Sequence, residues 1–94
     1  MLRIATEPHN GGVVLRVEGS LRGPWVNELE STWQRNRHYP QVRVHLADVS
    51  YVDDAGKSLL ARMVEHGAAL TASGPYMQAI VEGITRIEAA RSAK

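Results

Sequence analysis

The sequence predicts an α/β fold, a small mixed β-sheet with helices packed on it, in the order β-β-α-β-α-β-α. Near the N-terminus, two segments that alternate apolar and polar residues flank an Asn-Gly step, which is typical of an antiparallel hairpin. Beyond it, helical periodicities alternate with short strand-like segments, and strands separated by helices run parallel with right-handed crossovers. The 94 residues, of which 44% are hydrophobic, fit one globular domain over residues 1–94.

The hairpin is predicted from Leu2–Thr6 and Val13–Val17, where the alternation is clearest. The connecting segment Pro8–Gly12 contains the Asn-Gly step, and both of its residues tolerate a positive φ. We therefore expect the sheet to begin with one antiparallel pair.

The first helix is predicted to begin at Gly23-Pro24, because proline suits the first helical position, where its missing N–H costs nothing. Tyr39-Pro40 is predicted to end it. Helical spacing favours core packing over a binding platform for its apolar residues, which are Trp25, Val26, Leu29 and Trp33.

A central strand is predicted over Val42–Leu46, followed by a helix that runs to about His66 and ends at Gly67 in the C′ position. The inner face of this helix is predicted to carry Leu59, Leu60, Met63 and Val64. Its outer face is predicted to carry Lys57, Arg62, Glu65 and His66.

Ala68–Ala72 is predicted to form the last strand, and Ser73-Gly74-Pro75 turns the chain into a third helix. Gly83 is expected to shorten that helix, because glycine costs about 1 kcal/mol in a helix interior. The predicted apolar positions of this helix are Met77, Ile80, Val81, Ile84 and Ile87.

Composition bounds the class of protein. The chain has no cysteine, which excludes disulfides and thiolate zinc sites, and its net charge is only +1. No signal peptide is visible, and no apolar run approaches the roughly 20 residues of a membrane span. We therefore expect a soluble, cytoplasmic protein without direct membrane insertion.

Cofactor, metal and nucleic-acid sites are not predicted. Phosphate-binding glycine motifs are absent, and the one basic cluster, Arg35, Arg37 and His38, lacks interleaved aromatic residues. The four histidines lie on different predicted elements without ligand spacing: His9, His38, His45 and His66. His45 is expected to be a hydrogen-bonded core histidine rather than a ligand or proton carrier.

Two adjacent carboxylates, Asp53 and Asp54, stand where the central strand runs into the second helix. Unpaired backbone N–H groups and the helix dipole favour negative charge at such a position. We expect one carboxylate to cap the helix and the other to be exposed at its tip. Neighbouring residues usually point apart, and no nucleophile or base is placed beside them, so the chain is not predicted to be an enzyme.

Five segments, in this order and spacing, resemble the STAS domain family, named for sulphate transporters and anti-sigma-factor antagonists. The resemblance covers nearly the whole chain and rests on Leu15–Leu21, Val42–Leu46, Val52–Gly56, His66–Gly74 and Val81–Ile84. It implies a non-enzymatic protein-interaction module of bacterial signalling that docks a kinase-like anti-sigma partner through the Asp53–Gly56 loop and the following helix. The implied partner-binding residues are Asp53, Asp54, Ala55, Gly56, Lys57 and Ser58.

The chain departs from the family at the position that a partner kinase phosphorylates. The Asp-Ser-Ser-Gly motif of the family reads Asp-Asp-Ala-Gly here, and the phosphorylated serine aligns with Ala55, which has no hydroxyl. Phosphorylation at that position is therefore excluded, and Ser58 is expected to be an ordinary helix residue. His45 and Lys57 also differ from the usual family residues, which leaves the identity of the partner open.

Alternatives to the signalling interpretation remain. One is a STAS subunit of a lipid-transport ABC system that binds its ATPase, and another is a small-molecule sensor. Paired carboxylates at a helix N-terminus would repel an anionic ligand, which argues against the sensor. Asp54 is either a permanent charge that imitates a phosphorylated state or part of a surface that was never phosphorylated, and we favour the second. The sequence leaves the oligomeric state open.

Overall fold

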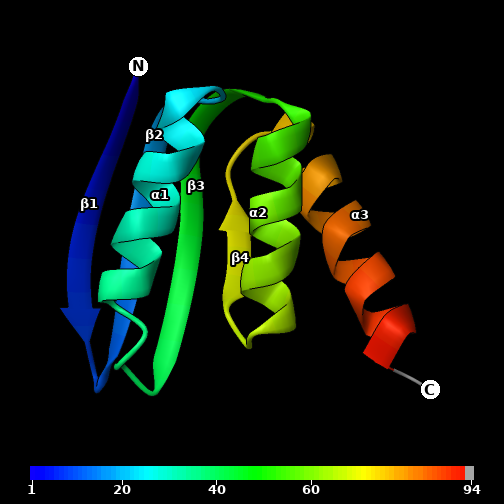
Figure 1. Cartoon of the computed structure of the whole chain (residues 1–94). Helices are drawn as coiled ribbons and strands as arrows, with labels where there is room; N and C mark the ends of the chain where they lie inside the picture. The colour runs from blue at the N-terminus through cyan, green and yellow to red at the C-terminus, as the bar shows by residue number, and fades with distance from the viewer. Residues whose placement is uncertain (93–94) are drawn as a thin grey trace.

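The computed structural model describes residues 1–92, and these have the predicted order of elements, which confirms the α/β fold class (Figure 1). In chain order the elements are β1 (Leu2–His9), β2 (Gly12–Leu21), α1 (Pro24–Arg35), β3 (Gln41–Val52), α2 (Asp54–Glu65), β4 (Ala69–Ala72) and α3 (Pro75–Ser92).

The four strands form one mixed sheet in the order β1-β2-β3-β4. β1 and β2 are antiparallel, with His9 paired to Gly12 next to the turn, while β2, β3 and β4 are parallel. In the two-residue turn, Asn10 and Gly11 have φ of 48° and 81°, as a hairpin of this length requires. The predicted hairpin is confirmed.

Parallel strands place the starts of all three helices at one end of the sheet. Each of β2, β3 and β4 leads directly into the helix that follows it, so α1, α2 and α3 begin where those strands end, at the top of Figure 1. We call this end the carboxyl end of the sheet. Loops that follow parallel strands meet there, and α/β domains usually place their functional groups at this end.

One face of the sheet packs against helices, and within residues 1–92 the other is uncovered. Side chains alternate between faces along each strand, and the buried set on the central strands is Val13, Leu15, Val17, Val44 and Leu46. The opposite face carries Arg16, Glu18 and Arg43. α1 and α2 lie over the covered face and α3 lies beyond β4 (Figure 1).

In the described part of the chain, no helix is long and apolar enough to cross a membrane.

Two predicted boundaries in the middle of the chain are wrong. α1 ends at Arg35, before Tyr39-Pro40, because Asn36 caps it. The Asn36 side-chain amide donates to the Thr32 carbonyl at 2.7 Å, and its backbone N–H donates to the Trp33 carbonyl at 3.0 Å. β3 extends past Leu46 to Val52, because β2 continues beside it as far as Leu21.

The C-terminal helix also differs from its prediction. α3 passes through Gly83 without a break and reaches Ser92. Its buried stripe runs from Met77 through Val81 to Glu88, which lies eleven positions, about three full turns, after Met77. Ile87, one of the apolar positions that predicted this helix, lies to the side of that stripe and is 61% exposed. Val64 of α2 is likewise only half-buried.

Candidate docking site at the start of helix α2

Asp53 caps α2 and also holds the start of α1. One carboxylate oxygen, Oδ1, accepts the Gly56 backbone N–H at 2.8 Å, and the other, Oδ2, accepts the Gly23 backbone N–H at 3.0 Å. The backbone N–H of Asp53 donates to the Leu21 carbonyl at 3.1 Å. The predicted helix cap is therefore confirmed, and the same carboxylate ties together two helix starts that lie 30 residues apart.

The two hydrogen bonds to Asp53 predict a pH dependence of stability. They favour the ionised carboxylate and lower the pKa of Asp53 below its usual value of 3.8, with the Gly23 bond the larger cause. The unfolded chain lacks these bonds, so ionised Asp53 stabilises the fold fully above about pH 4, and this contribution is lost as the pH falls through the folded-state pKa.

We therefore expect Asp53→Asn to lower the free energy of unfolding at neutral pH and to differ less from wild type as the pH falls below about 4. Urea unfolding across this pH range measures the difference. Asp54→Asn is the matched control, because its exposed side chain accepts none of these bonds. If the free energy of unfolding of Asp53→Asn differed from that of wild type by the same amount at every pH, the expectation would be contradicted.

Gly56 places the first turn of α2 directly on the strand ends. It is buried, and a Cβ atom there would lie 2.8 Å from the Leu21 carbonyl oxygen and 2.8 Å from Cγ1 of Val52. Real Cβ atoms do not approach neighbours this closely. The absence of a side chain at Gly56 therefore lets α2 sit against β2 and β3.

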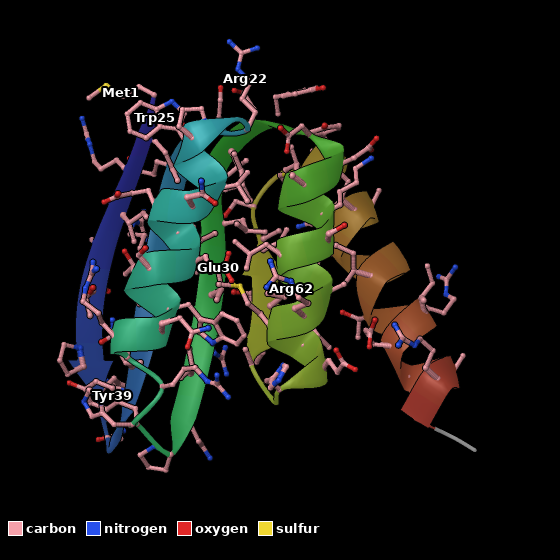
Figure 2. The ribbon with its side chains drawn as sticks, viewed as in Figure 1. Met1, Arg22, Trp25, Glu30, Tyr39 and Arg62 are labelled. Carbon is pink, nitrogen blue, oxygen red and sulfur yellow. The ribbon has the colours of Figure 1, made fainter. Side chains whose placement is uncertain are left out.

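An ion pair joins the last turn of α2 to the middle of α1. Nη1 of Arg62 lies 2.9 Å from Oε2 of Glu30, and the two side chains point toward each other in Figure 2. This hydrogen bond raises the pKa of Arg62 above its usual value. Both side chains remain partly exposed, so the pair contributes at most about 1 kcal/mol. It is a direct side-chain contact between α2 and α1.

The structure divides the six predicted partner-binding residues into two groups. Asp53 and Gly56 are occupied within the fold, by hydrogen bonds in the first case and by tight packing in the second. The exposed group consists of Asp54, Ala55, Lys57 and Ser58. These four residues belong to the first two turns of α2 and present their side chains to solvent, so we call them the α2 surface.

Further exposed residues lie at the same end of the sheet and were missed by sequence reasoning. Tyr51, near the end of β3, is 48% exposed, and Tyr76, in the first turn of α3, is 47% exposed. Arg22 follows β2 and projects away from the ribbon (Figure 2). Each residue lies at a strand-to-helix junction, and that shared position is the signal in the sequence that could have identified them.

Two other predicted features are clarified. Nδ1 of His45 lies 2.7 Å from Oγ1 of Thr71, so the histidine is hydrogen-bonded as predicted, but it is half-buried on the uncovered face rather than in the core. Trp33 is buried in the core as predicted, whereas Trp25 is half-buried. Within residues 1–92, no group of three or more histidine and carboxylate side chains is placed to hold a metal ion.

Comparison with known proteins supports the fold only. No protein-family model matches the chain, and no curated protein matches it. A chain in the crystal structure of Mglu is similar, with 24% sequence identity and a TM-score of 0.60 over 76% of this chain and 19% of that chain. This chain thus spans about a fifth of the length of that one. At this identity the likeness shows a shared fold and assigns no function.

Proposed function

We propose that this chain is a non-enzymatic protein-interaction module of bacterial signalling, which docks a kinase-like anti-sigma partner through the α2 surface. The observation that carries the proposal is the geometry of the β3–α2 junction. Asp53 and Gly56 hold the first turn of α2 against the sheet, and this leaves Asp54 and Lys57 exposed beside it. The STAS resemblance supplies the class of partner.

A surface of this kind suits protein recognition. Its backbone is already ordered by the Asp53 hydrogen bonds, so a partner would not have to order a flexible loop when it binds. The exposed tyrosines Tyr51 and Tyr76 at the same end add large side chains of the type enriched at interfaces. The exposed carboxylate of Asp54 and the ammonium group of Lys57 would give the contact its charge specificity.

Asp54→Ala is expected to weaken partner binding about tenfold, as loss of one charged contact at the centre of an interface does. Its effect on folding should be small, because Asp54 is exposed and its side chain makes no hydrogen bond or ion pair within residues 1–92. The measurement is affinity capture from the native cell extract with the wild-type chain as bait, followed by titration of the captured partner.

Glu82→Ala is the matched control for this experiment. Glu82 is also an exposed carboxylate, but it lies on α3, away from the carboxyl end of the sheet, and its ion pair is a long, 3.9 Å contact with Arg86. Capture of a kinase-like anti-sigma protein that is reduced by Asp54→Ala and unchanged by Glu82→Ala would support the proposal. Capture of a transport ATPase would instead assign the chain to a lipid-transport system. Equal binding by wild type and Asp54→Ala would show that the α2 surface is not the contact.

A further inference from the structure

β1 forms a free edge of the sheet. It is hydrogen-bonded to β2 on one side, and for the described residues Figure 1 shows no element beyond it on the other. The strand is eight residues long, whereas proteins usually keep edge strands short or cover them, because unpaired N–H and C=O groups attract another strand. The question is what this edge would pair with.

The backbone groups on the free side can be assigned from the hairpin. Along an antiparallel strand, the backbone N–H and C=O groups of successive residues point alternately toward the neighbouring strand and away from it. The Ser20 N–H donates to the Met1 carbonyl at 3.0 Å, and His9 pairs with Gly12 across the two-residue turn, so odd-numbered β1 residues point toward β2. The N–H and C=O groups of Leu2, Ile4 and Thr6 therefore point outward, together with the C=O group of Pro8.

Pro8 fits this assignment. Proline has no N–H to donate, and within a sheet it is confined to positions where that donor would face away from the neighbouring strand. Pro8 lies near the end of β1 with the same parity as Ile4 and Thr6, so it leaves the β1–β2 ladder intact. The part of β1 that precedes it remains available for pairing.

The side chains of β1 are complementary in charge to a second copy of the same strand. If Ala5 lies opposite Ala5 of another copy in an antiparallel pair, Arg3 of each copy lies opposite Glu7 of the other. Arg3 is 79% exposed and makes a long, 3.7 Å contact with Glu18. Glu7 is exposed and forms no ion pair within residues 1–92. Opposite charges on facing residues of paired strands are stabilising.

This register is preferred over its neighbour. A pairing with Ile4 opposite Ile4 would use the same outward-pointing groups, but it would place Arg3 opposite Ala5 and leave both charges unmatched. In the Ala5-centred register, the partly buried Ile4 lies opposite Thr6 of the other copy on the helix-covered face. The half-buried Trp25 lies on α1, the helix that covers this same face of the sheet (Figure 2).

The helices leave room for such a pairing. A two-fold axis through Ala5, perpendicular to the sheet, keeps the helices of both copies on the same face. The two β2 strands would then be three strand spacings apart, about 14 Å. Because α1 packs over β2, the two α1 helices would be separated by more than the roughly 8–10 Å of packed helices. No overlap of the helical layers is required.

We propose that this chain forms a symmetric dimer by antiparallel pairing of β1 with β1 of a second copy, centred on Ala5, with reciprocal Arg3–Glu7 ion pairs. The carboxyl end of the sheet remains open in this dimer, so each copy keeps its α2 surface. A single added strand pair buries less area than a standard interface, so the dimer is expected at protein concentrations of about 0.1–1 mM.

The test uses charge reversal and sedimentation equilibrium. Arg3→Glu places a second carboxylate opposite Glu7, and Glu7→Arg places a second guanidinium opposite Arg3, so each variant alone creates two repulsive pairs. We expect each to raise the dimer dissociation constant at least tenfold. An equimolar mixture of the two variants contains chains that can pair oppositely charged residues again, and it should form a heterodimer that is tighter than either variant's own dimer.

The mixture tests whether positions 3 and 7 of the two chains face each other. In the Ala5-centred heterodimer, both facing pairs join a carboxylate of the Arg3→Glu chain to a guanidinium group of the Glu7→Arg chain, so we expect a gain in affinity over either variant's own dimer. Melting curves of the single variants check that each is folded. Both residues are exposed, so little change is expected for Glu7→Arg, whereas Arg3→Glu also faces Glu18 of its own β2 and should melt at a slightly lower temperature.

Three results would overturn the proposal. The first is a wild-type chain that is monomeric at about 1 mM. The second is a dimer that neither reversal affects, because the copies would then meet elsewhere. The third is a mixture that binds no more tightly than the single variants, because the two strands would then pair in another register.

Discussion

Replacing Gly56 with alanine is expected to destabilise the protein by about 2–3 kcal/mol, as overpacking of a tight site does. The new Cβ would lie 2.8 Å from the Leu21 carbonyl oxygen, which is part of the backbone and cannot rotate away as a side chain can. The first turn of α2 would have to move off the ends of β2 and β3. Urea unfolding measures the loss of stability, and the same displacement should weaken binding at the α2 surface.

Gly83→Ala is the matched control. Gly83 also lies inside a helix, but nothing approaches within 4 Å of the position of its Cβ. Alanine there should stabilise α3 by about 1 kcal/mol, because glycine loses more backbone entropy in a helix. Opposite signs at the two positions are the expected result. A stabilising Gly56→Ala substitution would show that the close approach of α2 to the strand ends is not tight.

Leu60→Ala is expected to lower the free energy of unfolding by about 2–5 kcal/mol, as other large-to-small core substitutions do. Leu60 is fully buried, in the middle of the α2 face that packs on the sheet. Truncation removes apolar contacts and leaves a cavity beneath α2. Chemical unfolding with an unchanged slope against denaturant would assign the effect to the folded state.

Ile87→Ala is the comparison for Leu60→Ala. Ile87 belongs to the same apolar pattern that predicted the third helix, but its side chain is 61% exposed. Its truncation should therefore change the stability by no more than about 0.5 kcal/mol. A loss at Ile87 as large as that at Leu60 would mean that this side chain is covered in solution.

Local signals predicted the fold where a few neighbouring residues decide the structure. The Asn10-Gly11 turn and the proline at the start of α1 are of this kind, because their backbone preferences act without help from the rest of the chain. The length of β3 could not be predicted in this way. Asp48 and Ser50 interrupt its apolar pattern, and only pairing with β2 keeps this segment in the sheet.

The third helix shows a different limit of sequence reasoning. Ile87 follows the apolar pattern and Glu88 does not, yet Glu88 is the buried residue of the two. The buried carboxylate of Glu88 has a hydrogen-bond partner on its own helix, since its Oε2 accepts from Nη1 of Arg91 at 3.1 Å. A spacing of eleven residues keeps Glu88 in line with Met77, whereas the apolar pattern drifts around the helix.

The candidate site was predictable in its parts but not in its connections. Adjacent carboxylates at a strand-to-helix junction predict one cap and one exposed side chain, and Asp53 and Asp54 have those roles. The bond from Gly23 to Asp53 depends on how α1 and α2 are placed side by side. No local pattern contains that information. The same is true of Tyr51 on β3 and Tyr76 on α3. They lie at one end of the sheet only because β3 and β4, the strand before α3, are parallel.

Different residues support α2 and form its exposed surface, which has a consequence for evolution and design. Asp53 and Gly56 support the helix, and the four residues of the α2 surface are exposed. Substitutions at Asp54, Ala55, Lys57 and Ser58 would change the surface offered to the proposed partner without disturbing the bonds and the close packing that hold the helix in place. Recognition could therefore diversify while the architecture stayed constant. The first two turns of α2 are accordingly a natural place to install a new binding specificity on this scaffold.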